Sequence, residues 1–257
     1  MKPDDRRRSY RVWGFVLVAA LLVLWELSAR FWVGSPNWPP VTHVVTAGVD
    51  GIRSGELLRV FLSSLGRMLA GFGIGAALGV AIGLCMGRFR LVNAALDTLV
   101  ELLRPIPMPA IVPPLILLLG IDSTMKITIV AFAVFFPVLV NTVAGVRSVD
   151  RVALDVARTF HVSSTRALLQ VVVPASMPYI MVGLRTSLAL ALIVTVVAEM
   201  IAGSEGIGFH LMTMQYAMRP GEMYFSILLL AMLGYLLNLC MVRVERRVLH
   251  WYQRAGT

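Results

Sequence analysis

The 257-residue chain has few of the charged groups with which a soluble protein covers its surface. Only 14% of its residues are charged, 58% are hydrophobic, and the mean hydropathy is +0.81. Soluble domains have roughly 45–50% apolar and about 25% charged residues. A soluble fold of this length would therefore lack the polar side chains that it needs, and the composition predicts a membrane protein.

Sequence motifs for nucleotide binding and metal binding are also missing. There is no GxxxxGK[ST] loop, so the chain lacks the usual cradle for a nucleotide. There is no HExxH motif and no cysteine pair with metal spacing, and the four histidines are scattered. Cys85 and Cys240 lie within or at the end of apolar runs and are interpreted as small hydrophobic residues. We expect no metal site and no enzymatic activity.

Long apolar segments dominate the chain, and each is long enough to cross a hydrocarbon layer of about 30 Å. They predict an all-α, polytopic fold with six transmembrane helices in a single domain, residues 1–257. No clear cleavage site follows the first segment, so we expect it to remain as a span. Five prolines, beginning with Pro105, predict a broken helix in the third. The spans are expected at residues 12–33, 60–86, 93–119, 125–146, 178–202 and 223–243.

The net charge of +9 is distributed as a topology signal rather than as a nucleic-acid surface. Fifteen basic residues lie in the N-terminus, the 87–92 turn, the 147–177 loop and the C-terminus, from Lys2 to Arg254. Because short cytoplasmic loops carry the excess of Lys and Arg, both termini are expected in the cytoplasm. The opposite side has five basic residues, namely Arg30, Arg53, Arg59, Lys126 and Arg219.

The second span has a glycine at every fourth position. On a helix this spacing produces one face without side chains, which permits close approach of another membrane helix. We expect tight packing within the bundle, and a role in solute passage is the alternative. The glycines are Gly71, Gly75, Gly79, Gly83 and Gly87.

Ionisable residues inside spans are costly and normally face protein or water. Glu101 and Arg104 lie three residues apart, which favours a pair on one helix face, although Arg104 beside a broken helix could instead contact an anionic solute. Glu199 could pair with Arg104 or with a second chain. The candidate lining of a pathway is Glu101, Arg104, Pro105, Met108, Asn141 and Glu199.

The longest inner loop predicts two short helices joined near residues 161–164. Asp150 and either Ser163 or Ser164 are suitable N-caps, and Pro174 and Pro178 are expected to end the second helix. Such a helix–turn–helix could transmit force from a soluble partner, and an ordinary amphipathic connector is the alternative.

This loop resembles the EAA motif of permeases of binding-protein-dependent ABC importers, which reads E-A-A, three residues, G, nine residues, then I-x-L-P. Asp155, Val156 and Ala157 match the first three positions, and His161 stands where the family has glycine. Val171 and Val173–Pro174 match the end in the same register. The segments LLRPIPMPAIVPPLILLLGI, FFPVLVNTVAGVRSVD and VAEMIAGSEGIGF extend the resemblance over residues 55–250 and are similar to the nitrate/sulfonate/taurine group.

The resemblance implies a type I (MetI-like) permease fold in the bacterial inner membrane, with a core at residues 59–245. It also implies that the 150–174 segment couples to a separate cytoplasmic ATPase, which would hold ATP and magnesium. Two permease chains, most simply a homodimer, would act with two ATPases and a solute-binding protein. The solute would be an organosulfonate-, taurine- or nitrate-like anion, or alternatively a thiamine-precursor-like or other small heterocycle. The implied coupling residues are Asp155, Val156, Ala157, His161, Arg166 and Pro174.

Two other classes of function, a secondary transporter and a membrane scaffold, fit the sequence less well than an ABC importer permease. A secondary transporter would need its own coupling chemistry, and we find neither an inverted repeat nor a chain of intramembrane carboxylates. A membrane scaffold would need no pathway, which the proline-broken third span argues against.

Overall fold

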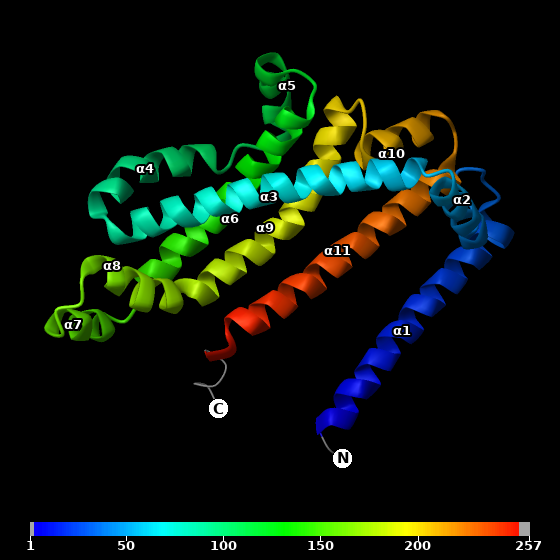
Figure 1. Ribbon diagram of the computed structural model, residues 1–257. Coiled ribbons are helices and arrows are strands. Elements are labelled where there is room, and N and C mark those ends of the chain that lie inside the picture. Colours follow the sequence, from blue (N-terminus) through cyan, green and yellow to red (C-terminus); the bar gives the residue numbers. More distant parts are fainter. Residues whose placement is uncertain (1–2, 252–257) are drawn as a thin grey trace. The chain divides into compact units, whose positions relative to one another are not determined.

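The computed structural model describes residues 3–251, and these residues form helices joined by short turns (Figure 1). This confirms the all-α prediction. Lys2 and Arg254 of the charge count lie outside the described residues. The elements are α1 (Pro3–Leu27), the π-helical η1 (Ser28–Val33), α2 (Val41–Arg53), α3 (Glu56–Arg88), α4 (Arg90–Leu103), α5 (Met108–Leu119), α6 (Ser123–Arg147), α7 (Arg151–Thr159), α8 (Ser164–Ala167), the π-helical η2 (Leu168–Val172), α9 (Val173–Ala202), α10 (Ile207–Tyr216) and α11 (Pro220–Val248).

Five helices of the described chain are long and apolar enough to cross a membrane, and there are six spans if the bent pair α4–α5 counts as one. This agrees with the six predicted spans. The axes of α4 and α5 differ by 101°. The break lies at Arg104–Pro107, where Pro105 and Pro107 lack the N–H groups that would continue the hydrogen-bond ladder. The predicted interruption of the third span is therefore confirmed.

The prediction that Pro174 and Pro178 end the second inner helix is wrong. The helix continues from Ser164 through η2 and both prolines to Ala202. The wider π-helical turn at Leu168–Val172 ends two residues before Pro174, and such turns shift the carbonyls with which a proline ring would otherwise clash. The 164–172 segment is thereby joined rigidly to α9.

The chain divides into two compact units, and each is described by itself. The first comprises the described residues up to Arg59 together with His210–Leu230. An aromatic cluster of Trp25, Trp38 and Tyr224 stabilises it, with ring centroids 5.5–5.8 Å apart. The indole of Trp25 also donates to the carbonyl of Pro39 at 3.1 Å. These contacts hold the end of α1, the turn at residues 34–40 and the beginning of α11 together.

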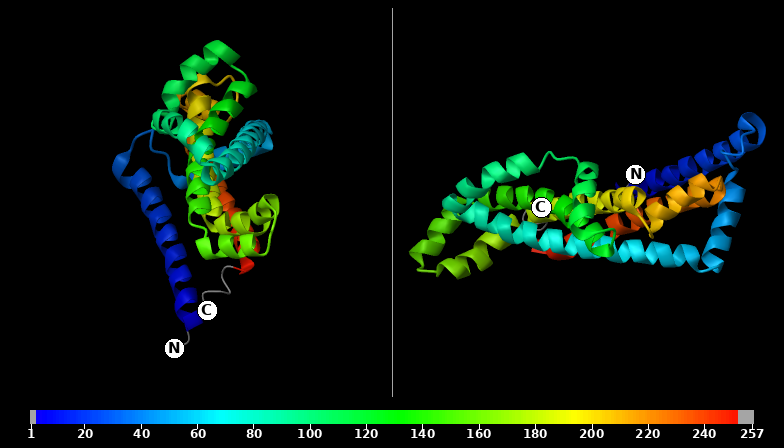
Figure 2. Two further views of the ribbon diagram at one scale, coloured as in Figure 1. Left: turned by 90° about the vertical axis from the view of Figure 1, so that its left-hand side faces the viewer. Right: turned by 90° about the horizontal axis from the view of Figure 1, so that it is seen from above.

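The second unit comprises Val60–Phe209 and the described residues from Ala231 onward. Its core lies between α6 and α9, which run side by side (Figures 1 and 2). Small and β-branched side chains from both helices are almost completely buried, and between membrane helices such packing stabilises through van der Waals contacts. The central residues are Ile129, Val130, Ala133, Val134, Val138, Ala191, Val194 and Ala198.

The glycine face of α3 lies against α6. A Cβ atom at Gly71 would lie 2.7 Å from Cβ of Val130, and one at Gly83 would lie 2.7 Å from Cβ of Thr142. Gly75, Gly79 and Gly87 have equally close neighbours on α6, whereas Gly73, on another face of α3, has no atom within 4 Å of that position. The four-residue spacing thus lets the two backbones approach more closely than alanine would permit.

Candidate functional site

The segment after α6 forms a short helix with defined ends. The Asp150 side chain accepts a hydrogen bond from the amide of Val152 at 2.9 Å, as the predicted N-cap should. Ser163 precedes α8 but makes no side-chain cap bond. The predicted turn between two inner helices lies at residues 160–163.

His161 ends α7 in the left-handed conformation, with φ of 55°. Its amide donates to the carbonyl of Arg158, and the amide of Val162 donates to the carbonyl of Ala157, both at 2.9 Å. This pair of bonds is a Schellman motif, in which glycine is the preferred residue at the left-handed position. His161 therefore adopts the conformation that the family glycine would supply, at a steric cost of roughly 1 kcal/mol.

Helix α7 presents two different faces. Leu154 and Ala157 face the rest of the second unit, where they border a pocket of about 190 Å³ beside Gly87 on α3 and Leu168 on η2. The outward face has an apolar stripe of Val152, Val156 and Phe160, whose exposed fractions are 65%, 48% and 76%. A stripe of this kind, spaced four residues apart on a short helix, is typical of a surface that another protein covers.

The residues that the motif singled out have different surroundings. Asp155 and Arg166 are exposed, and Asp155 forms an ion pair with Arg158 at 2.9 Å. Ala157 is buried, and Pro174 is half-buried within α9. Ala157 and Pro174 hence position the segment, while Asp155, Val156 and Arg166 form part of its surface.

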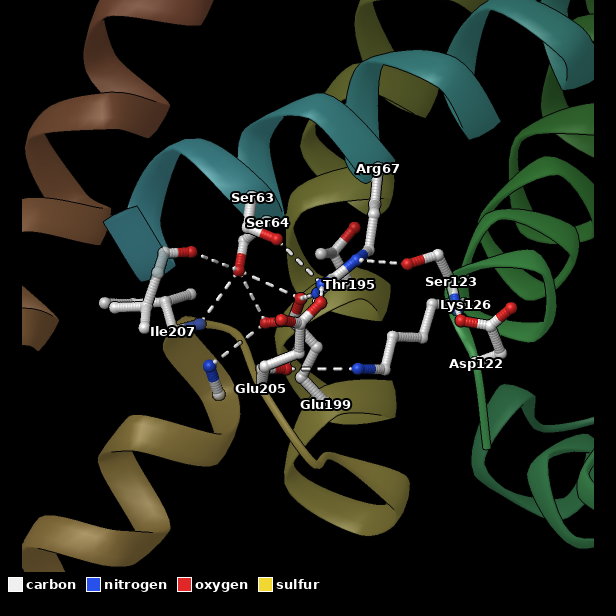
Figure 3. A network of polar contacts seen from close by, with 12 residues as sticks. Ser63, Ser64, Arg67, Asp122, Ser123, Lys126, Thr195, Glu199, Glu205 and Ile207 are labelled. Carbon is white, nitrogen blue, oxygen red and sulfur yellow. Dashed lines mark hydrogen bonds and ion pairs between the residues drawn. The ribbon is translucent and has the colours of Figure 1, made fainter. Parts of the chain in front are cut away.

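A network of buried charges lies at the ends of α6 and α9 that are distant from α7 (Figure 3). Glu199 on α9 is fully buried and accepts from Nη1 of Arg67 at 2.9 Å. The hydroxyl of Ser64 lies 2.8 and 2.9 Å from the two carboxylate oxygens. Such a pair satisfies two charges that would be costly to bury singly.

The same carboxylate fixes the turn between α9 and α10. Oε2 of Glu199 accepts from the amide of Gly208 at 3.1 Å, and the amide of Ile207 donates to Oγ of Ser64 at 2.8 Å. These bonds satisfy two free amides at the beginning of α10. Gly206, with φ of 112°, lies so close to the carboxylate that any side chain there would collide with it.

Arg67 uses all three of its nitrogens. Nε donates to Oγ of Ser123 at 3.1 Å and Nη2 donates to Oγ of Ser63 at 2.7 Å, while Nη2 also pairs with the carboxylate of Glu205. Lys126 is 1% exposed, and its Nζ donates to the backbone carbonyl of Glu205 at 3.0 Å. Lys126, which the charge count assigned to the side opposite the termini, thus lies in the first turn of α6 among buried groups and not at an exposed surface.

The predicted partners of the intramembrane charges also need correction. Glu199 pairs with Arg67 rather than with Arg104, because Arg67 lies beside it on α3. Glu101 and Arg104 are both exposed, and the described residues contain no ion pair between them. Asn141 donates to the carbonyl of Pro137 at 2.8 Å within α6, Met108 packs against the core, and Pro105 is exposed at the α4–α5 break.

Sequence reasoning missed Arg67 altogether. It is a single cation within the 60–86 apolar run, and Glu199 is a single anion near the end of the 178–202 run. Spans two and five cross the membrane in opposite directions, so residues near the beginning of one and the end of the other lie at the same depth. Opposite charges at one depth were the available signal.

A pocket of about 590 Å³ lies within the first unit and is bordered by α2 and the turn between α10 and α11. His43 and His210, which are far apart in the sequence, both line it, together with Asp50 and Glu56. Burial lowers the pKa of His210, while the nearby carboxylates of Glu56 and Glu222 oppose this shift. No group of three or more potential metal ligands occurs within the described part of the chain.

Comparison with known proteins identifies the family to which the chain belongs. Residues 71–251 match the family described as "Binding-protein-dependent transport system inner membrane component". The chain is 35% identical to the putative aliphatic sulfonates transport permease protein SsuC of Escherichia coli (strain K12), with 94% of this chain and 92% of that protein covered. It is 33% identical to the SsuC protein of Bacillus subtilis (strain 168), with 97% and 91% covered.

A further relative is the taurine transport system permease protein TauC of Escherichia coli (strain K12), at 30% identity over 91% of this chain and 88% of that protein. Among solved structures, an inward-facing MetNI methionine ABC transporter has a chain that superposes with a TM-score of 0.65 at 16% identity. The superposition covers 75% of this chain and 95% of the other, which shows a common fold.

Proposed function

Since this chain belongs to the family of binding-protein-dependent inner-membrane components and is the permease subunit of an ABC importer, we propose that its solute is a small organic or inorganic oxyanion. The family works with a separate ATPase and a solute-binding protein, and the several apolar helices make this chain a multi-pass membrane protein. Support for an oxyanion comes from relatives named for aliphatic sulfonates, taurine and bicarbonate. The alternative, a small heterocycle, has no comparable support.

The proposed site of coupling is the 150–174 segment, which would dock on the ATPase, where ATP and magnesium would bind. The observation that carries this proposal is the exposed stripe of Val152, Val156 and Phe160 beside the exposed charges of Asp155 and Arg166. His161 would fix the angle between α7 and α8, and Ala157 and Pro174 would hold the segment against the bundle. A docking surface needs such a rigid base.

The proposed assembly contains a second permease chain, most simply a second copy. Large leucine side chains are exposed on the bent pair α4–α5, among them Leu91, Leu102, Leu117 and Leu118. Within a bilayer such side chains can face lipid or another helix, so the surface is compatible with a dimer. The distribution of basic residues supports a cytoplasmic position for both termini, which would put α7–α8 on the cytoplasmic side.

The coupling proposal is tested by co-purification from a mild detergent extract. Phe160→Asp places a charge within the apolar stripe and should abolish recovery of the ATPase, whereas Phe160→Leu preserves an apolar side chain and should retain it. Equal recovery of the ATPase with both variants would show that the stripe is not the docking surface.

The solute proposal is tested by uptake into proteoliposomes that contain the complete importer and its binding protein. Ethanesulfonate, taurine and bicarbonate are compared with a neutral pyrimidine. ATP-dependent uptake of at least one oxyanion is expected, and uptake of the pyrimidine alone would exclude the proposed solute class.

A further inference from the structure

Arg67 and Lys126 place two buried cations beside one another at the end of the second unit that is opposite α7. Both point at the backbone carbonyl of Glu205, from 3.5 Å for Nη1 of Arg67 and 3.0 Å for Nζ of Lys126. Their exposed fractions are 5% and 1%. Among the described residues of this unit, Glu199 is the one buried carboxylate, so the buried side chains have more positive than negative charge.

Glu205 supplies the second negative charge from the surface. Its carboxylate pairs with Nη2 of Arg67, yet 58% of its side chain is exposed, compared with 6% for Arg67 and none for Glu199. It stands in the turn between α9 and α10, flanked by Ser204 and Gly206. Glu205 is thus the member of the network that solvent reaches, while Glu199 is fixed by Ser64 and Gly208.

Two hydroxyl groups complete the surroundings of the guanidinium. Oγ of Ser63 and Oγ of Ser123 each accept a hydrogen bond from Arg67, so the hydrogen atom of each hydroxyl is available to a further acceptor. A guanidinium fork, an ammonium group and two hydroxyl groups together are a donor set that matches the several oxygens of a sulfonate, carboxylate or bicarbonate.

We infer that this cluster is an anion site of the permease, in which the carboxylate of Glu205 occupies the position taken by the acidic group of the solute. The solute displaces Glu205 from Arg67, and Lys126 contributes the second positive charge. The charge of the buried groups is balanced both before and after this exchange, so neither state leaves a buried cation without an anion. A neutral solute could not make this exchange.

The inference rests on the proposed oxyanion solute and on the proposed orientation, which puts the cluster at the outer side of the membrane. Arg67 lies in the fourth turn of α3, which has 33 residues, Lys126 in the first turn of α6, and Glu199 in the last turn of α9. All three lie at the ends of these helices that are distant from α7, and hence at the side where a solute-binding protein delivers its cargo.

The test measures binding of ³⁵S-labelled ethanesulfonate to the complete transporter in lipid nanodiscs, without the solute-binding protein. Glu205→Gln removes the competing carboxylate and should bind the probe roughly tenfold more tightly, because the site is no longer occupied by the chain itself. Lys126→Gln should bind it at least about tenfold more weakly. Glu222→Gln, which alters a carboxylate paired with Arg219 in the other unit, is the matched control and should match wild type.

Glu205→Gln decides the question even if Lys126→Gln fails to fold, since Glu205 is exposed and Arg67 keeps its bond to Glu199. Binding to Glu205→Gln within twofold of wild type, or no measurable binding to either, would overturn the anion site. Oxyanion uptake by the wild-type importer is scored separately. Uptake together with unchanged binding would refute the anion site alone, whereas wild-type uptake of the neutral pyrimidine alone would refute the proposed solute.

Discussion

The buried pair of Arg67 and Glu199 allows a quantitative test by a double-mutant cycle. Glu199→Gln removes the negative charge and replaces one carboxylate oxygen, to which either Nη1 of Arg67 or the amide of Gly208 donates, by an amide NH₂ that cannot accept. Arg67→Gln leaves the carboxylate with neutral donors only. Removal of one partner of a buried pair costs about 3–5 kcal/mol, because the other charge remains buried.

The double variant Arg67→Gln/Glu199→Gln should be much less destabilised than the sum of the two single variants. It contains no unpaired charge, and two amides of similar size can form a hydrogen bond with each other. We expect the single variants to lower the melting temperature by about 10 °C. The double variant should recover roughly 2–3 kcal/mol of the summed loss.

The assay is thermal unfolding of the detergent-solubilised chain, followed by intrinsic tryptophan fluorescence and by the fraction that remains monodisperse. The control cycle uses Arg219→Gln and Glu222→Gln, whose ion pair spans 3.0 Å with the arginine side chain 61% exposed. That cycle should give a coupling energy of about 1 kcal/mol or less. Strict additivity at Arg67 and Glu199 would refute the interpretation that the two charges stabilise the fold as a pair.

Two further substitutions test local packing and local backbone geometry. Gly79→Ala should destabilise the fold by about 1–3 kcal/mol, because its Cβ would lie 2.9 Å from the carbonyl oxygen of Phe135. Gly73→Ala has open space around it and should be neutral or slightly stabilising in the same thermal unfolding assay. Equal effects of the two substitutions would contradict the close packing of α3 and α6. His161→Gly should slow amide hydrogen exchange in α7 about fivefold, because glycine removes a steric cost of roughly 1 kcal/mol at φ of 55°. Thr159→Gly, in the helical part of α7, should not slow the exchange. Faster exchange in His161→Gly would contradict the backbone strain assigned to His161.

Much of the fold could be predicted from the sequence because hydropathy and proline act locally. The length of each apolar run sets the spans, and Pro105 and Pro107 break the third span wherever the rest of the chain lies. The register of the motif placed His161 at the family's glycine position, and the structure has a left-handed residue there. In contrast, the continuation of α9 through Pro174 depends on a π-helical turn that hydropathy does not reveal.

The polar network was less predictable because its geometry is tertiary. Arg67, Lys126 and Glu199 belong to three different helices, and their separation depends on how closely those helices pack. The sequence placed Lys126 at the outer end of the fourth span, where hydropathy does not decide whether a lysine extends toward water or points inward. Only the packed structure shows that Lys126 points inward to the carbonyl of Glu205.

Helices α6 and α9 connect the proposed docking segment with the buried network. Helix α6 extends over about 38 Å at 1.5 Å per residue, from the buried network at Ser123 to Arg147, shortly before α7. It packs closely against α9 at Gly183, where a Cβ would lie 2.9 Å from Cβ of Asn141. A pair of helices packed in this way moves as one body rather than bending. Displacement of α7 by an ATPase would then be absorbed where the chain is not helical, and two such places are the Pro105–Pro107 break and the Gly203–Gly206 turn. The second of these turns holds Glu205, so the same movement that reorients the helices would change how firmly Glu205 competes for Arg67.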